Sequence, residues 1–537
     1  MKSWCFAAGF SVALLAGCRD EGKDPVKSHA GHVGAVDFPV SCSPAARREF
    51  NEAVTLLHHM TYPQARLAFQ QVAATDPKCA MAQWGIAMTL FQPLWPTRPD
   101  SAARARGWNA MMQAQALVPP TRRESLFVAA TTAFFLDPAS PDYWQRISRW
   151  KEASGLIHEA FPQDAEATVF YALALLAAAP SSTDSPESSR EAAELLLAVY
   201  RENPDHPGAM HYLVHANDAP GREQQSLDVT RKYEVTAPHN PHALHMPTHI
   251  YTRLGDWDGV IRGNRLAADA ALQYPAGDEG QFVWDEFPHA IEYLVYAYLQ
   301  KGLDDSAGAQ LRRLMTTARL EPSFKTAFHL SSSQARFALE RRDWAEAAAI
   351  VPRLPPSLDW DRFAWPEAIS QFARGLGAVH LGRLAEARAA AARIAQLDSG
   401  MTRAGEELFA RNIRMLHLEL AAWIAQQERR PSAAVAFMEQ AAALEASTPK
   451  HAVTPGPTLP ASELLGDLLM LQRKPVEALG AYRHSLALYP RRCNSVAGAI
   501  RAARMVGDTA SVRTFYQEGD TQCLSLARNS ISTTISH

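Results

Sequence analysis

A recurrent pattern of small, large and helix-terminating residues constrains the fold of this chain more than any other feature. A small residue, a large apolar residue four positions later and a proline eight positions after that recur at distant points of the 537-residue sequence. The clearest cases are Ala65-Phe69-Pro77, Ala192-Leu196-Pro204 and Ala478-Tyr482-Pro490. The small residue lets two helices approach, the large one fills the groove between them, and proline ends the helix. The pattern therefore predicts packed helical hairpins.

The small residue recurs at regular intervals along almost the whole chain. The steps from Ala192 to Ser226 to Val260, and from Ala478 to Val512, are each 34 residues long, and other steps run from 40 to 47. Turn strings occur at the inter-helix positions that this frame requires: Leu254-Gly255-Asp256-Trp257, Arg342-Asp343-Trp344 and Leu381-Gly382-Arg383. Agreement of the interval, the turns and the prolines indicates a repeat protein.

A 34-residue period with this signature resembles the tetratricopeptide repeat (TPR), a hairpin of two helices. The resemblance covers almost all of the chain after residue 37. It implies an all-α fold, a right-handed superhelical solenoid of about ten or more TPR-like hairpins. Because one hairpin cannot bury its apolar face alone, neighbours stack and leave a long concave surface, so the implied default function is binding.

Three segments follow from the repeat frame and the distribution of histidine. Residues 38–180 are expected to form an N-terminal TPR-like helical region, in which residues 95–140 are helical without an assigned repeat. Residues 181–345 are the central histidine-rich repeats, and residues 346–537 are the C-terminal repeats. Residues 447–460 break the period, and we interpret them as a connector, with a lid over the groove as the alternative.

The first 37 residues are interpreted as an export signal and a tether. Lys2 precedes a short apolar stretch, and Leu15-Ala16-Gly17-Cys18 resembles the bacterial lipobox. We therefore expect residues 1–17 to be a lipoprotein signal peptide, Cys18 the lipidation site and residues 18–37 a flexible, lipid-anchored tether, with ordinary secretion as the alternative. The resemblance implies a bacterial cell-envelope location facing the periplasm, and Arg19 favours the outer membrane.

Charge and the common catalytic motifs exclude some functions. A formal net charge of -3 and a pI near 6.7 lack the basic excess that binds phosphates, so we expect no nucleic-acid partner and membrane contact through the lipid anchor only. The sequence holds neither a glycine-rich phosphate loop nor a Gly-x-Ser-x-Gly elbow. No catalytic residue is assigned, and an enzyme is not predicted.

Export would place the remaining four cysteines in an oxidising compartment, where disulfides form. Cys493 begins the first helix of the last predicted hairpin and Cys523 ends its second, so we predict a Cys493–Cys523 bridge. Cys42 and Cys79 are the second candidate pair. Four buried, inert thiols are the alternative.

Histidine is concentrated in the middle of the sequence, where seven of nineteen lie between residues 206 and 249. His211 with His215, and His245 with His249, have four-residue spacing, which places each pair on one helix face. The pairs are 34 residues apart and so occupy equal positions of successive repeats. The superfamily resemblance places further candidates on the concave groove: His242, His289, His329, Glu292 and Tyr296.

Three interpretations of this cluster stay open. As a first hypothesis, the protein is a binding scaffold that grips a peptide, protein or small ligand in the histidine-rich groove. As the alternative, His211, His215, His245 and His249 hold a divalent transition metal, zinc or copper, with or without catalysis, because imidazole suits these metals. A purely structural hydrogen-bond network is the third. An enzyme built on the metal site would need a general base, for which Glu292 is the best candidate.

Longer strings resemble a bacterial family of tetratricopeptide lipoproteins with no settled activity. They are the segments 211–220, 241–255, 79–85, 289–298 and 453–457. Gln92 departs from that family, where we expect histidine. Asp285 and Glu286 form an acidic pair, but adjacent residues on a helix point apart, so we expect a solvated turn there.

Overall fold

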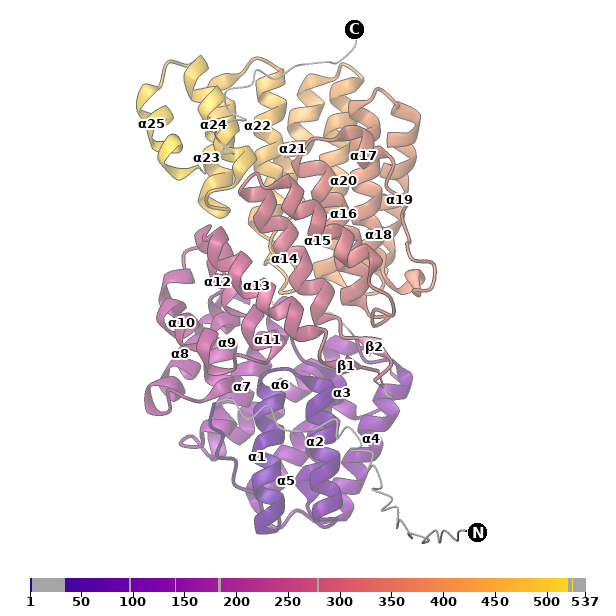
Figure 1. Ribbon diagram of the computed structural model, residues 1–537, viewed down its shortest axis with the longest axis vertical. Helices are drawn as coiled ribbons and strands as arrows, with labels where there is room; N and C mark the ends of the chain where they lie inside the picture. Colours follow the sequence, from indigo (N-terminus) through magenta and orange to yellow (C-terminus); the bar gives the residue numbers. More distant parts are fainter. Residues whose placement is uncertain are drawn as a thin grey trace.

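The described part of the chain is an all-α superhelical repeat of helical hairpins (Figure 1). The computed structural model describes residues 34–95, 98–140, 142–181, 185–277 and 280–519, together with Met1 and Leu524. Residues 2–33 lie outside this range, and so does Cys523. The predicted signal peptide, the lipidation site Cys18, most of the tether and the Cys493–Cys523 pairing therefore stay predictions, although Cys493 itself is disulfide-bonded.

Seven helices build the N-terminal region, at the indigo and violet end of Figure 1. They are α1 (Pro44–His58), α2 (Tyr62–Thr75), α3 (Ala80–Phe91), α4 (Ser101–Ala116), α5 (Arg122–Phe135), α6 (Tyr143–Ala160) and α7 (Ala165–Ala178). Each packs on the next, and α4 with α5 accounts for the helical stretch that had no assigned repeat. The predicted Cys42–Cys79 disulfide is present, and it joins the entry of α1 to the entry of α3.

The central region carries nine of the nineteen histidines. Its helices are η1 (Ala179–Ser181), α8 (Ser185–Glu202), α9 (Pro207–Asn217), η2 (Glu223–Ser226), α10 (Leu227–Thr236), α11 (Pro241–His245), α12 (Pro247–Leu254), α13 (Trp257–Ala271), α14 (Glu286–Gln300), α15 (Asp304–Thr316) and α16 (Phe324–Glu340). Two short strands, β1 (Pro275–Ala276) and β2 (Phe282–Val283), form an antiparallel pair before α14.

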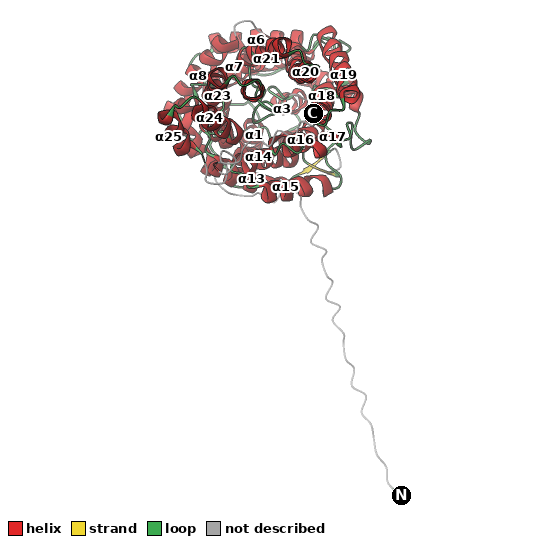
Figure 2. Ribbon diagram, turned by 90° about the horizontal axis from the view of Figure 1, so that it is seen from above, coloured by secondary structure: helices red, strands yellow, loops and turns green. Residues whose placement is uncertain are grey.

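The C-terminal region continues the same stacking. Its helices are α17 (Trp344–Ala348), η3 (Trp360–Arg362), α18 (Ala364–His380), α19 (Leu384–Arg403), α20 (Glu407–Gln427), α21 (Pro431–Ala446), α22 (Ala461–Leu471), α23 (Pro475–Leu488), α24 (Cys493–Met505) and α25 (Thr509–Glu518). Viewed along the long axis, α13, α15 and α19 lie toward the outside and α14, α16 and α18 toward the inside (Figure 2). The inner helices also contact one another across the stack.

The residues of the repeat signature act as predicted. Phe69 of α2 lies so close to Gly85 of α3 that a side-chain carbon at Gly85 would collide with its ring. Tyr482 of α23 lies in the same way against Gly466 and Gly498. At the predicted turns, Gly255 has a φ of 66°, a left-handed conformation that glycine adopts without strain. Sequence and packing therefore agree at these hairpins.

Residues 447–460, here called the inner loop, connect α21 to α22 and cross the interior of the stack. Arg336 of α16 holds the loop by donating to the carbonyl oxygens of Gly456 and Pro457 at 2.5 and 2.7 Å and to Thr454 Oγ1 at 3.1 Å. Lys450 Nζ lies 2.6 Å from Asp218 Oδ2. The loop is thus more than a connector, because it joins helices far apart in the sequence.

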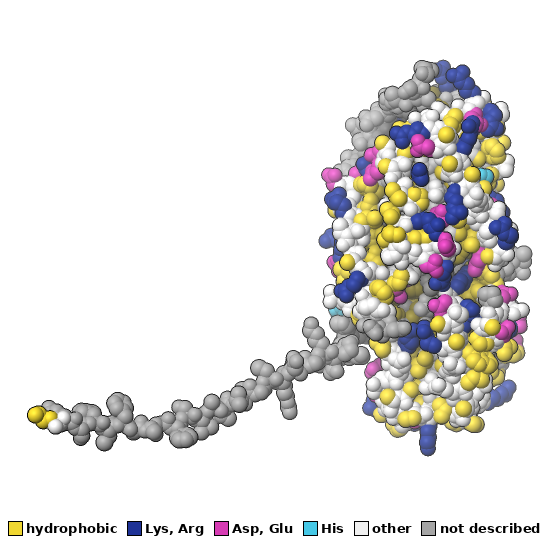
Figure 3. Space-filling model, turned by 90° about the vertical axis from the view of Figure 1, so that its right-hand side faces the viewer, with side chains coloured by type: hydrophobic (Ala, Val, Ile, Leu, Met, Phe, Trp, Pro, Cys, Tyr) yellow, Lys and Arg dark blue, Asp and Glu magenta, His cyan; other side chains and the backbone are white. Residues whose placement is uncertain are grey.

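The surface offers no membrane-spanning element among the described residues: none of their helices has the length and apolar character needed to cross a bilayer. On the face in Figure 3, lysine and arginine side chains are interspersed with aspartate, glutamate and apolar side chains. Such mixing is typical of a solvated surface.

Candidate metal centre

Four inner elements bring the central histidines together. His211 and His215 lie on α9, His242 and His245 on α11, His249 on α12 and His289 on α14. The two four-residue pairs face each other across neighbouring repeats, as the 34-residue interval predicts. The structure therefore brings all four histidines of the metal hypothesis to one place in the interior of the solenoid.

The first group of three imidazoles, here called triad A, consists of His211, His215 and His242. One ring nitrogen from each lies within 4.8 Å of the others. The Nε2 atoms of His211 and His242 are 3.2 Å apart. His211 and His242 are buried, and His215 is partly exposed toward a cavity.

The second group, here called triad B, consists of His245, His249 and His289. Their three donor nitrogens also lie within 4.8 Å of one another, and the Nε2 atoms of His245 and His249 are 3.0 Å apart. All three side chains are buried. The triads adjoin, because the ring centroids of His215 and His249 are 5.7 Å apart and those of His242 and His245 are 6.1 Å apart.

Fixed partners decide which nitrogen of each triad B ring carries the proton. Asn264 donates its Nδ2 to the carbonyl of Val260, so its Oδ1 accepts from His245 Nδ1 at 2.7 Å. His249 Nδ1 donates to Asp218 Oδ2 at 2.7 Å. A neutral imidazole with its proton on Nδ1 has a lone pair on Nε2. Two lone pairs therefore face each other across 3.0 Å.

A hydrogen-bond relay fixes the third ring of triad B in the same form. His329 Nδ1 on α16 donates to Glu292 Oε2 at 2.5 Å, and in the neutral form of His329 its Nε2 accepts from His289 Nδ1 at 3.0 Å. His289 Nε2 is then unprotonated. Glu292 also accepts hydrogen bonds from Ser332 and Arg336. Burial opposes its ionisation, but the contacts with His329, Arg336 and Ser332 together lower the pKa of Glu292.

Triad A follows the same rule at its two fully buried members. His242 Nδ1 lies 3.0 Å from Glu286 Oε2, and His211 Nδ1 lies 2.5 Å from the carbonyl oxygen of His58. Both Nδ1 atoms donate to these acceptors, so in the neutral form of each ring the lone pair lies on Nε2. His215 Nε2 is buried and has no hydrogen-bond partner among the described residues.

Burial keeps most of these imidazoles neutral. It lowers the pKa of His211, His215, His245 and His289 well below 6.5, and neighbouring histidines lower them further. The pKa of His249 falls to about 4, because burial and Lys450 outweigh Asp218. Neutral imidazole is the form that binds metals. Facing lone pairs at such short distances repel unless a cation lies between them.

Two carboxylates behind the rings remain charged. Burial opposes the ionisation of Asp218, but Lys450 and Arg253 lower its pKa well below 3.8. Burial likewise opposes ionisation of Glu286, and Lys325 and His242 lower its pKa well below 4.5. Carboxylates that accept from the far nitrogen of a histidine orient the ring and raise its basicity toward a metal.

A third group of buried side chains, His58, Glu166 and His206, also brings its donor atoms within 4.8 Å of one another. His206 Nδ1 accepts from the backbone N–H of Ala209, so its protonated Nε2 points at Glu166 Oε1, 3.2 Å away. His58 Nε2 lies 2.9 Å from Glu166 Oε2. His206 Nε2 and Glu166 Oε1 nevertheless form no hydrogen bond with each other or with any other described residue. This group differs from the two triads because a carboxylate takes the place of one imidazole.

Three sequence interpretations need correction. Glu292 does not face the triads as a free base, because His329, Ser332 and Arg336 occupy its oxygens. Tyr296 also lies away from them: its hydroxyl accepts from Arg492 at 3.2 Å, and its ring contacts Trp257. The histidines do not line an open groove, since the helices and the inner loop bury most of them.

The prediction of a solvated turn at Asp285 and Glu286, where α14 begins, is also wrong. Asp285 and Glu286 are 3% and 1% exposed, and Lys325 lies between them and pairs with both. Their side chains point to different partners, as neighbours on a helix must, but both partners are inside the protein. Lys325 belongs to α16, which packs on α14 but lies about 40 residues further along the chain, so no local pattern indicates this burial.

Sequence reasoning missed several contributing residues. Tyr293, not Tyr296, contacts triad B, with ring centroids 4.7 to 5.5 Å from His245, His249 and His289. Its four-residue spacing from His289 was the available signal. Asp218 follows His215 by three residues, but Asn264 and Lys450 come from distant segments, and no local pattern marks them.

Comparisons with known proteins add little to this geometry. No family model matches the chain, and no curated protein matches its sequence. A crystal structure of the APC/C hetero-tetramer Cut9–Hcn1 is 13% identical, with a TM-score of 0.32 over 91% of this chain and 94% of that chain. The human IFIT1 dimer with PPP-AAAA is 11% identical, with a TM-score of 0.37 over 91% and 92%. Likeness this distant carries no argument about function.

Proposed function

We propose that this protein binds two transition-metal ions inside its solenoid, one at triad A and one at triad B. The observation that carries the proposal is the pair of buried, unprotonated Nε2 atoms of His245 and His249, 3.0 Å apart with both far nitrogens already donating. A metal ion bound by both would draw on these lone pairs and remove their repulsion.

The donor set favours zinc or copper. Each triad offers three imidazole nitrogens and no carboxylate ligand, and imidazole-rich sites suit zinc and copper, whereas calcium and magnesium require oxygen. Three protein ligands leave one coordination position open, which is typical of sites that bind an exogenous molecule. Asn264, Asp218, His329 and Glu286 would hold the rings in place.

The test is elemental analysis of protein purified without added metal, followed by reconstitution with Zn²⁺ or Cu²⁺. We expect about two equivalents per chain, about one after His249→Ala and about one after His211→Ala. His484→Ala is the matched control, because His484 is exposed on α23, and it should retain both ions. Folding of each variant is checked by its helical circular dichroism.

Unchanged metal content in both triad variants would overturn the proposal, and so would purified and reconstituted wild-type protein that holds no metal. The hypothesis of a scaffold that binds a peptide, protein or small ligand would then be favoured, since helical repeat proteins use extended concave surfaces for binding. The proposal is independent of the expected membrane anchor, which concerns where the protein works.

A further inference from the structure

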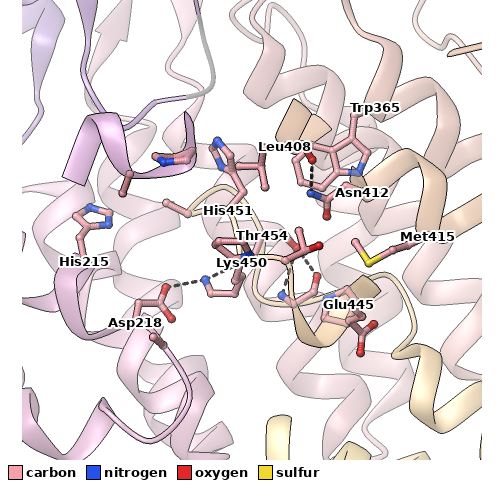
Figure 4. Close-up of a pocket in the computed structure, with 18 of the residues that line it drawn as sticks. His215, Asp218, Trp365, Leu408, Asn412, Met415, Glu445, Lys450, His451 and Thr454 are labelled. Carbon is pink, nitrogen blue, oxygen red and sulfur yellow. Dashed lines mark hydrogen bonds and ion pairs between the residues drawn. The ribbon is translucent and has the colours of Figure 1, made fainter. Parts of the chain in front are cut away.

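A cavity of about 570 Å³ opens beside triad A. Side chains from the N-terminal region, the inner loop and the C-terminal helices line it, and His215 and Asp218 lie at one side of it in Figure 4, with Met415 and Glu445 at the other. A volume of this size suits a small organic molecule. His215 is the triad residue that reaches the cavity wall.

Aromatic rings form much of the wall. Trp95, Tyr143, Trp144, Phe328 and Trp365 all line the cavity. Phe328 and Trp365 pack edge to face, with ring centroids 4.8 Å apart. Flat apolar walls of this kind favour a flat, aromatic ligand body, because ring–ring contacts add to the burial of apolar area.

Two carboxyl groups in the same wall are unusual because they are buried and form no ion pair with the residues that the structure describes. Glu419 of α20 and Glu445 of α21 are 1% and 7% exposed. Glu419 Oε2 and Glu445 Oε1 have no hydrogen-bond partner among the described residues, and Glu445 Oε2 accepts from the backbone of Ala461. Burial raises the pKa of Glu419 well above 4.5 and that of Glu445 to about 7.

Three of the four cations that line the cavity already pair with carboxylates, and the fourth, Arg222, donates to the carbonyl oxygen of Ser189. Arg98 pairs with Glu406, and Lys450 and Arg253 pair with Asp218. An unpaired buried carboxyl group gains most from a ligand that brings its own positive charge and N–H donors. The wall therefore favours an ammonium group at Glu419 and Glu445 over an anionic group.

We infer that the cavity binds an arylalkylamine, with its ammonium group at Glu419 and Glu445, its ring among Phe328 and Trp365 and its far end directed toward His215. The placement of the far end rests on the proposed function, since it brings the ligand to the open coordination position of the ion at triad A. The amine and ring contacts need no metal.

The experiment uses tyramine as the probe and 4-ethylphenol, which has the same ring but no amine, as the control compound. Calorimetric titration of metal-free protein should show tyramine binding at least about tenfold tighter than 4-ethylphenol. Glu419→Gln should remove that preference, whereas Glu439→Gln, an exposed glutamate on α21, should retain it. Trp365→Ala should weaken both molecules about tenfold. Equal affinities for the two molecules, or a preference unchanged by Glu419→Gln, would overturn the inference.

Cobalt-loaded protein tests the reach toward His215. Tyramine should change the visible absorption of the bound Co²⁺, and Glu419→Gln, which leaves every triad histidine in place, should weaken this response, whereas Glu439→Gln should retain it. An unchanged spectrum on saturation with tyramine would overturn the placement of the far end. If the protein held no metal but bound tyramine through Glu419, the metal proposal would fail and the amine site would stand.

Discussion

At the scale of single residues, Asn264 decides the protonation of His245. Its amide nitrogen donates to the carbonyl oxygen of Val260, so its amide oxygen faces the ring of His245. Because that oxygen only accepts, Nδ1 of the ring must carry the proton. Asp218 and His329 act in the same way on His249 and His289. Lone pairs are thus directed inward by groups that would not touch a metal themselves.

This role predicts the effect of Asn264→Leu. Without an acceptor for Nδ1, His245 can move its proton to Nε2, and metal affinity at triad B should fall about 10- to 100-fold. Competition titration against a chelator of known affinity measures the change. Asn264→Asp restores an oxygen acceptor and should recover most of the affinity. Equal loss in both variants would show that Asn264 acts through packing and not through the proton position.

His380 allows a prediction about pH that does not involve the triads. Its ring stacks on Trp344 with centroids 3.8 Å apart, and burial, aided by Arg342, lowers its pKa from 6.5 to about 3. Between these values the unfolded chain binds a proton that the folded protein does not, so stability falls as pH decreases. At pH 5 the loss is about 2 kcal/mol relative to pH 8.

The measurement compares urea unfolding of the wild type and His380→Phe at pH 8 and pH 5. The variant keeps a flat ring against Trp344 but cannot be protonated, so its loss of stability between the two pH values should be smaller by about 2 kcal/mol. An equal loss in both proteins would mean that His380 is already protonated, or freely solvated, in the folded state.

At the scale of elements, Arg336 joins α14, α16 and the inner loop. It pairs with Glu292 at 2.9 Å and donates to backbone oxygens of the loop. Arg336→Met should leave the buried carboxylate of Glu292 without its arginine partner and lower the free energy of unfolding by roughly 3 to 5 kcal/mol. Hydrogen exchange of residues 447–460 should accelerate. A loop that stays protected in a destabilised variant would show that its other contacts hold it.

The elements show where sequence reasoning succeeds. Hairpins follow from spacing: Ala65 and Phe69, the turn at Gly255 and the equal positions of His211 and His245 are all local or periodic signals. The inner loop does not follow, because its partners Arg336 and Asp218 lie far away in the sequence. Glu419 and Glu445 look like surface glutamates in the sequence, and only the packing of α20, α21 and α22 buries them.

At the scale of the whole molecule, the expected lipid anchor remains a prediction from residues 15–18. Only the thiol of Cys18 can accept a lipid there, so Cys18→Ser should move the protein from the membrane fraction to the soluble periplasmic fraction. Fractionation and immunoblotting measure this, and Cys5→Ser, within the predicted signal peptide, is the control. Membrane association that is unchanged by Cys18→Ser would contradict the lipobox interpretation.

The whole account depends on the interior of the solenoid holding metal, and anomalous diffraction from crystals of the metal-loaded protein tests this most directly. Data collected on both sides of the metal absorption edge should give two peaks per chain. One is expected among the Nε2 atoms of His245, His249 and His289, at about 2.0 to 2.1 Å from each, and the other among His211, His215 and His242. A map without peaks at either triad, or with its strongest peak at His58, Glu166 and His206, would contradict the account.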